Sequence, residues 1–243
     1  MSELAVKPVA RRGRIWVVLM LSLGLIALGY AIVNISTQKP DLDIVHIEGI
    51  SEAQEIFGGI PQEGERLGSS DAPVTIQVFN DLQCSSCREA FLTTIPTLAE
   101  NYARPGSVKL LYRHYSNSET ELERGFFGAE AAAEQGYGWQ YTYLFFRNQE
   151  EIKGAGEARF ETFVDSVAGS VEELETGEWE KAREEAEAGE GPIPGRLKSD
   201  AELGEDLGIR FGQAMIVSGP NGSRTLQDSP TLAEAEKAIA EVE

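Results

Sequence analysis

The sequence predicts an α/β fold, and three observations lead to that prediction. Segment 74–79 is β-branched and aromatic, as buried strands are, and segments 107–115 and 213–218 are expected to be further strands. Segments with apolar side chains at three- and four-residue spacing lie between them, the longest helical stretch running over about 118–207. Hydrophobic residues make up 42% of the 243 positions, which is enough for a core and excludes a wholly disordered chain.

The charge and the cysteine count exclude further classes of protein. The chain carries 40 Asp and Glu against 21 Lys and Arg, a formal net charge of -19. An acidic surface repels phosphates, so we expect no nucleic acid partner. With only 2 Cys, the chain is not a small domain held together by disulfides.

The N-terminus has the pattern of a membrane anchor. Four basic residues precede an uncharged apolar run over 15–33: Lys7, Arg11, Arg12 and Arg14. At about 1.5 Å per residue the run makes roughly 28 Å of helix, close to the thickness of a bilayer core. The positive-inside rule predicts a cytoplasmic tail at 1–14, a single pass through the cell membrane and an extracytoplasmic remainder. The alternative is a cleaved secretory signal, with a weak cleavage site near 27–29.

Segment 34–66 is predicted to be an extracytoplasmic linker, because it is polar, contains Pro40 and Pro61, and shows no sustained period. A short helix over 51–57 is expected within it. The folded domain is then expected to span 67–243.

Within 67–243, a strand over 74–79 leads through a turn at Cys84 to a helix over 85–102, and a second strand follows at 107–115. Further helices are expected at 121–135, 139–148, 160–168, 179–188 and 197–207. Strands at 213–218 and 224–227 flank a turn at 219–222. A closing helix over 231–242 should begin with a capping box formed by Thr231 and Glu234.

The two cysteines lie three positions apart, as Cys84 and Cys87, on the first turn of a helix that follows a buried strand. The helix dipole and unpaired backbone N–H groups at that place stabilise a thiolate on the first cysteine. Cys84 is therefore the expected nucleophile, and the more buried Cys87 the resolving thiol. Their redox-active disulfide needs no other cofactor, and no metal is expected.

Two other uses of the pair stay open at this stage. It could form half of a zinc site, which would need two more ligands such as His46 and His114. It could also be an inert structural disulfide, although closing so short a loop removes little chain entropy.

Residues 67–76 and 78–88, with the core Asp81-Leu82-Gln83-Cys84-Ser85-Ser86-Cys87-Arg88, resemble the DsbA-like branch of the thioredoxin superfamily. The chain is especially similar to membrane-anchored bacterial members, and the resemblance continues through 110–113, 131–148 and 207–217. It implies a thioredoxin-like fold with an inserted helical domain over about 118–207, and thiol–disulfide exchange with exported protein substrates. It also implies a membrane partner that resets the pair, either a quinone-linked reductase or an electron-carrier thiol protein.

Three positions depart from the family pattern. Gln213 and Ala214 stand in the substrate-binding loop, where relatives carry a cis-proline; a cis bond before alanine costs roughly 2.5–4 kcal/mol, so a trans peptide is expected. Serines fill the two positions between the cysteines, where relatives tend to have proline and an aromatic residue or histidine. Val78 replaces an acidic residue that in relatives assists proton transfer from the buried cysteine.

Two further side chains have a functional and an ordinary interpretation. Arg88 could support the Cys84 thiolate, or it could be a solvated helix residue. His114 could be a base, or a strand-end residue with a hydrogen-bond partner.

Two functions follow from these observations. The first is a membrane-tethered, extracytoplasmic thiol–disulfide oxidoreductase that works in either the oxidase or the reductase direction. The second is a degenerate thioredoxin fold that holds a client or a metal without efficient turnover, because Ala214 replaces the proline. An Ala214→Pro variant separates them, since it should gain exchange activity if this loop is the defect.

Overall fold

The computed structural model describes residues 45–116, 123–154, 156–210 and 213–243. The predicted anchor at 15–33 lies outside these residues, as do the tail at 1–14 and the first part of the predicted linker. Within the described part of the chain, no helix combines the length and the apolar character needed to cross a bilayer.

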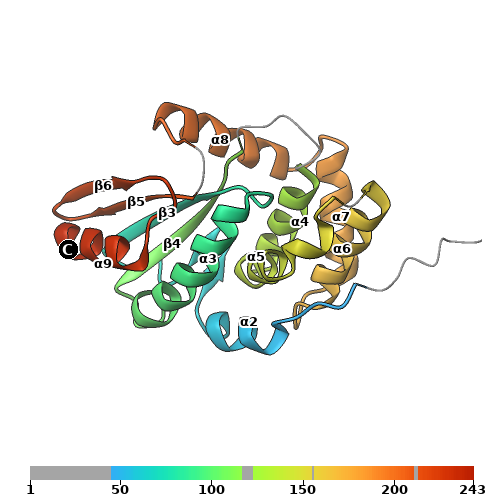
Figure 1. Cartoon of the computed structure of the whole chain (residues 1–243), viewed down its shortest axis with the longest axis horizontal. Coiled ribbons are helices and arrows are strands. Elements are labelled where there is room, and N and C mark those ends of the chain that lie inside the picture. The colour runs from blue at the N-terminus through green and yellow to red at the C-terminus, as the bar shows by residue number, and fades with distance from the viewer. Residues whose placement is uncertain (1–44, 117–122, 155, 211–212) are drawn as a thin grey trace, which may run out of the picture. The chain divides into compact units, whose positions relative to one another are not determined.

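A six-stranded sheet occupies one side of the folded unit (Figure 1). Its order is β1 (Gln62–Glu63), β2 (Arg66–Leu67), β4 (Val108–His114), β3 (Val74–Asn80), β5 (Ala214–Gly219) and β6 (Gly222–Leu226). The central strands β3 and β4 are parallel, and every other neighbouring pair is antiparallel. Parallel pairing requires a crossover, which α3 (Ser85–Leu98) and the π-helical turn Ala99–Ala103 supply.

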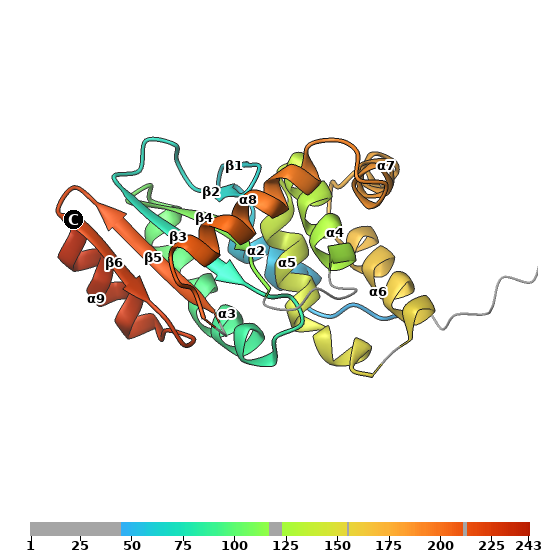
Figure 2. The same cartoon turned by 90° about the horizontal axis from the view of Figure 1, so that it is seen from above.

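Helices cover both faces of the sheet (Figure 2). On one face α3 packs against Val74, Ile76 and Val78 of β3, and α9 (Leu232–Val242) contacts β5. On the other face α8 (Ile193–Asp206) contacts β4, and its Leu203 packs on a smaller cluster that includes Phe79 and Ile216. The predicted capping box of Thr231 and Glu234 is confirmed at the start of α9.

The helical insertion follows β4, as predicted. It contains α4 (Glu123–Glu134), α5 (Gly138–Arg147), the 3-10 turn Gln149–Ile152, α6 (Glu157–Gly169), α7 (Thr176–Glu187) and α8. Helix α5 is buried along nearly its whole length, so its aromatic residues form the core that joins the insertion to the sheet: Trp139, Tyr141, Tyr143, Phe145 and Phe146.

The prediction of a linker up to residue 66 is wrong for residues 45–66, which belong to the folded unit. Helix α2 (Ile50–Phe57) contacts α5, and the ring of Phe57 is fully buried. The centre of this ring lies 6.4 Å from the ring centre of Trp139 and 5.8 Å from that of Tyr143. Strands β1 and β2 then extend the sheet beside β4. The expected short helix over 51–57 is confirmed as α2, in which Ala53 and Phe57, one turn apart, are buried.

Candidate active site

The two cysteines lie where β3 ends and α3 begins, and they are joined by a disulfide with a Cα–Cα distance of 5.1 Å. Cys84 is the N-cap of α3, and its Sγ accepts the backbone N–H of Cys87 at 3.1 Å. The hydroxyl of Ser86 lies 3.2 Å from the same sulfur. Both groups favour negative charge on Cys84, because N–H and O–H donors at a helix N-terminus stabilise an anion.

The two sulfur atoms differ in their access to solvent. Cys84 is half-buried, whereas Cys87 is fully buried within the main core. A client protein can therefore reach the sulfur of Cys84, whereas the sulfur of Cys87 is accessible only from within the protein. The prediction that Cys87 is the more buried of the two cysteines is confirmed.

The turn before Cys84 is fixed by side chains on both sides of it. The side-chain carboxylate of Asp81 accepts a hydrogen bond from the backbone N–H of Gln83 at 2.9 Å. The backbone carbonyl of Asp81 accepts one from the backbone N–H of Cys84 at 3.1 Å. From the insertion, the buried amide of Gln149 donates to the carbonyl of Leu82 at 2.5 Å. Sequence reasoning missed Gln149, because a single glutamine 67 positions away carries no local signal.

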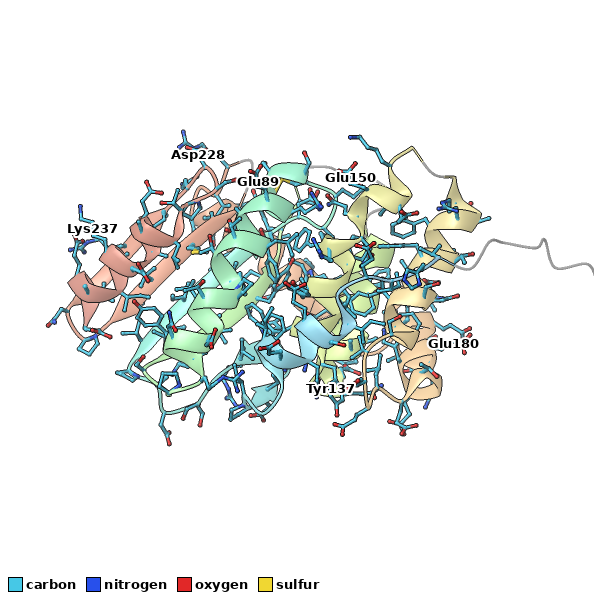
Figure 3. All side chains as sticks on the ribbon, turned by 60° about the horizontal axis from the view of Figure 1, so that its bottom comes forward. Glu89, Tyr137, Glu150, Glu180, Asp228 and Lys237 are labelled. Carbon is cyan, nitrogen blue, oxygen red and sulfur yellow. A yellow bond between two sulfur atoms is a disulfide. The ribbon has the colours of Figure 1, made fainter. Side chains whose placement is uncertain are left out.

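Arg88, the candidate support for the thiolate, reaches toward the insertion. Its Nε donates to the carbonyl oxygen of Phe146 at 2.8 Å, close to the end of α5. Arg88 thus ties the active-site helix to α5. Figure 3 shows the next side chain, the exposed Glu89, at the upper edge of the molecule.

The predicted substrate-binding loop leads into β5. Ala214 is buried and pairs with Phe79 of β3, and the carbonyl of Gln213 accepts the N–H of Ser229 at 2.8 Å. No peptide bond within the described residues is cis, so the bond between Gln213 and Ala214 is trans, as expected. The Gln213 side chain is fully buried, and neither of its polar atoms has a hydrogen-bond partner among the residues that the structure describes.

A partly buried cluster of charged residues lies at the end of β4, and its members were not linked to one another by any sequence pattern. His114 Nε2 lies 3.1 Å from Glu130 of α4, and Arg196 of α8 reaches the same carboxylate at 2.6 Å. Arg113 contacts Asp200 of α8 at 3.0 Å. Its Nη1 also contacts Glu65, which lies between β1 and β2, at 2.5 Å.

Burial and mutual repulsion shift the acids of this cluster. Burial, with Asp200 and Glu130 nearby, raises the pKa of Glu65 to about 7. Burial also raises the pKa of Asp200, against the opposing charges of His114 and Arg113. Burial disfavours the ionised form of Glu130 too, but the hydrogen bonds and charges of His114 and Arg196 outweigh it and lower the Glu130 pKa.

A family model described as thioredoxin matches residues 62–189, more than half of the 243 residues. This chain belongs to the thioredoxin family. Within that family it is a DsbA-like protein. Its match includes β3, the cysteine pair, β4 and most of the insertion.

Relatives and known structures agree with this assignment. The chain is 22% identical over 196 residues to a probable disulfide bond formation protein D of Bacillus anthracis, covering 80% of this chain and 82% of the relative. The oxidised BdbD of Bacillus subtilis matches with a TM-score of 0.60 at 16% identity, over 75% of this chain and 96% of BdbD. Wolbachia pipientis alpha-DsbA1 also matches with a TM-score of 0.60, at 13% identity, over 73% of this chain and 89% of that one. The thioredoxin-family protein described here is a thiol–disulfide oxidoreductase.

Proposed function

We propose that this protein exchanges disulfides with exported proteins on the outer side of the cell membrane, through the pair Cys84 and Cys87. The observation that carries the proposal is the asymmetry of the pair. Cys84 caps a helix and is half-exposed, while Cys87 is fully buried beneath it. The anchor predicted at 15–33 supports the location.

In the oxidase direction, a client thiolate attacks the Cys84 sulfur, and Cys87 leaves with the electron pair of the broken disulfide. A second client thiolate then attacks the client sulfur of the mixed disulfide, which forms the client disulfide and releases Cys84 as a thiolate. The client loses two electrons and the protein gains them. The reductase direction reverses these steps.

The reduced or oxidised pair must then be reset by another protein. The predicted anchor supports a partner within the membrane, either a quinone-linked reductase that removes two electrons or a thiol electron carrier that supplies them. The midpoint potential of the pair distinguishes these partners. The potentials of known catalytic cysteine pairs range from about −120 mV for an oxidant to about −270 mV for a reductant.

Trapping of clients tests the proposal in the full chain, expressed in the membrane of a bacterial host. A Cys87→Ser variant cannot resolve the mixed disulfide, so exported proteins should accumulate on Cys84 as adducts that a reductant releases. The matched control is the Cys84→Ser variant, which keeps one cysteine but should form no such adducts. Adducts on both variants, or on neither, would contradict the assigned roles.

Labelling of intact cells tests the location separately. After mild reduction, a maleimide that cannot cross membranes should modify Cys84 of the full chain without lysis. Labelling that requires lysis would show that the domain lies in the cytoplasm.

A further inference from the structure

The peptide unit that joins Leu82 to Gln83, in the turn that precedes Cys84, is held at both ends. Its carbonyl oxygen accepts a hydrogen bond from Nε2 of Gln149 at 2.5 Å, and its N–H donates to the carboxylate of Asp81 at 2.9 Å. The turn is closed by the hydrogen bond from the N–H of Cys84 to the carbonyl of Asp81 at 3.1 Å. The peptide unit therefore cannot rotate without breaking a hydrogen bond on each side of it.

Gln149 is the member of this arrangement that comes from the insertion. Its side chain is buried, as is Leu82, and within the described residues it provides the one hydrogen bond that the Leu82 carbonyl accepts. A buried carbonyl without a partner is unfavourable. Loss of the Gln149 donor is therefore expected to make the turn rearrange until the carbonyl finds another partner.

The position of Gln149 is fixed by the residue before it. The side chain of Asn148, at the C-terminal end of α5, accepts the N–H of Glu48 at 2.9 Å. It donates to the carbonyl oxygens of Glu48 at 3.1 Å and of Leu144 at 2.8 Å. Because these three hydrogen bonds hold the adjacent backbone, the buried amide of Gln149 is presented to the turn in one place.

The insertion also contacts the chain after the cysteine pair. The Nε of Arg88 donates to the carbonyl oxygen of Phe146 in α5 at 2.8 Å. Gln149 thus holds the chain before the pair, and Phe146 holds it after the pair. The pair lies between two hydrogen bonds to the last turn of α5 and the residues that follow it.

The turn determines where Cys84 lies relative to α3. Cys84 is the N-cap of this helix, with an extended backbone at φ −77° and ψ 116°, and its Sγ accepts the N–H of Cys87 at 3.1 Å. A thiolate in that place is stabilised by the unpaired N–H groups and the dipole of the helix. If the turn loosens, Cys84 can leave the cap, and its thiolate loses this stabilisation.

We propose that Gln149 is a positioning residue for disulfide exchange: by holding the Leu82 carbonyl it keeps Cys84 at the N-cap of α3, where the thiolate is stabilised. This inference rests on the exchange chemistry proposed above for the cysteine pair. In the oxidase direction Cys84 leaves as a thiolate when the client disulfide forms, and a more stable thiolate leaves faster. Gln149 therefore favours the reduced form of the pair and makes the pair a stronger oxidant.

The equilibrium of the pair with glutathione tests this role. The full-length protein in detergent is equilibrated with mixtures of reduced and oxidised glutathione at pH 7, quenched with acid, treated with an alkylating agent and weighed by mass spectrometry. A Gln149→Met variant has a side chain of similar length without a hydrogen-bond donor. Loss of the cap should shift the equilibrium constant about fivefold toward the disulfide, which corresponds to about 1 kcal/mol.

Alkylation of Cys84 gives a second readout, measured in a Cys87→Ser background. The thiolate is the species that reacts with iodoacetamide, so the rate against pH follows the ionisation of Cys84. Addition of Gln149→Met should move this profile toward higher pH and slow the reaction by up to about fivefold at low pH. A change in stability alone would not move the profile.

The chain provides a matched control in Gln140, a second buried glutamine of the insertion. Its Oε1 accepts a hydrogen bond from Nε2 of Gln62 at 2.8 Å. A Gln140→Met variant loses a buried amide in the same way but should keep the equilibrium constant and the pH profile of the unaltered protein. If Gln149→Met also keeps both, or if the two variants shift equally, the inference is overturned. If the unaltered protein forms no Cys84-dependent disulfide with glutathione, the proposed exchange function fails, which is a separate result.

A measurement on the unaltered protein covers the case in which the Gln149→Met variant does not fold. Hydrogen exchange, followed by nuclear magnetic resonance, reports whether the turn stays closed when the disulfide is open. The N–H groups of Gln83 and Cys84 should be protected in the reduced protein as they are in the oxidised one. Rapid exchange of both groups in the reduced protein would contradict the inference, because an open turn cannot hold Cys84 at the cap.

Discussion

Replacing Glu65 by glutamine is expected to remove a loss of stability that the protein suffers as the pH rises. The Glu65 side chain is only 14% exposed and contacts Arg113. Arg113 is shared with Asp200, which lies 3.0 Å away. One guanidinium therefore serves two carboxyl groups, and burial raises the pKa of Glu65 to about 7 from its ordinary 4.5.

The sign and size of the effect follow from proton linkage. Below pH 4.5 Glu65 is protonated in both the folded and the unfolded chain, so the difference between its two pKa values does not change the free energy of unfolding. Between pH 4.5 and 7 the unfolded chain loses this proton while the folded protein keeps it, and the free energy of unfolding falls as the pH rises. At about 1.36 kcal/mol for each pH unit, the loss reaches about 3 kcal/mol near pH 7 and then levels off.

Urea denaturation of the full chain in detergent, followed by tryptophan fluorescence at several values between pH 4 and 8, measures this quantity. As the pH rises over this range, the free energy of unfolding of the unaltered protein should fall by about 3 kcal/mol relative to that of the Glu65→Gln variant. Glu63→Gln is the matched control, because the Glu63 side chain is 79% exposed and should give a curve parallel to that of the unaltered protein. A Glu65→Gln curve that is also parallel to that of the unaltered protein would show that the pKa of Glu65 is not raised on folding.

Two further predictions concern the framework of the site. A Phe57→Ala variant should lower the free energy of unfolding by about 3–5 kcal/mol, because the fully buried ring packs against Trp139 and Tyr143. Urea denaturation measures this loss. A loss under about 1 kcal/mol would mean that residues 45–66 are not an integral part of the fold. A Thr231→Ala variant removes the hydroxyl that accepts the N–H of Glu234 and should cost about 1 kcal/mol in the same assay, with exchange activity unchanged.

The cysteine site could be read from the sequence because its parts are neighbours in the chain. The strand that ends at Asn80, the turn held by Asp81 and the helix that begins after Cys84 all lie within one short segment. Period, turn chemistry and cysteine spacing are local properties, and the structure has them where the pattern predicted. The capping box at Thr231 is local in the same way.

The linker prediction was wrong because membership of a core is not a local property. The segment 45–66 mixes polar residues with a few apolar ones, and its place in the fold depends on side chains such as Phe57, whose neighbours lie more than 80 positions away. A pattern search detects a repeated apolar face. It does not detect a single ring that fits a distant surface.

The α/β plan and the place of the cysteine pair at the start of a helix could be predicted from the sequence alone. Folding brings His114 to Glu130, Arg113 to both Glu65 and Asp200, and Arg88 to the end of α5, and no local pattern predicts these contacts. The physical reason is that burial and electrostatic shifts arise from all the groups that surround a side chain. In this protein those groups come from strands and helices as many as 87 positions apart.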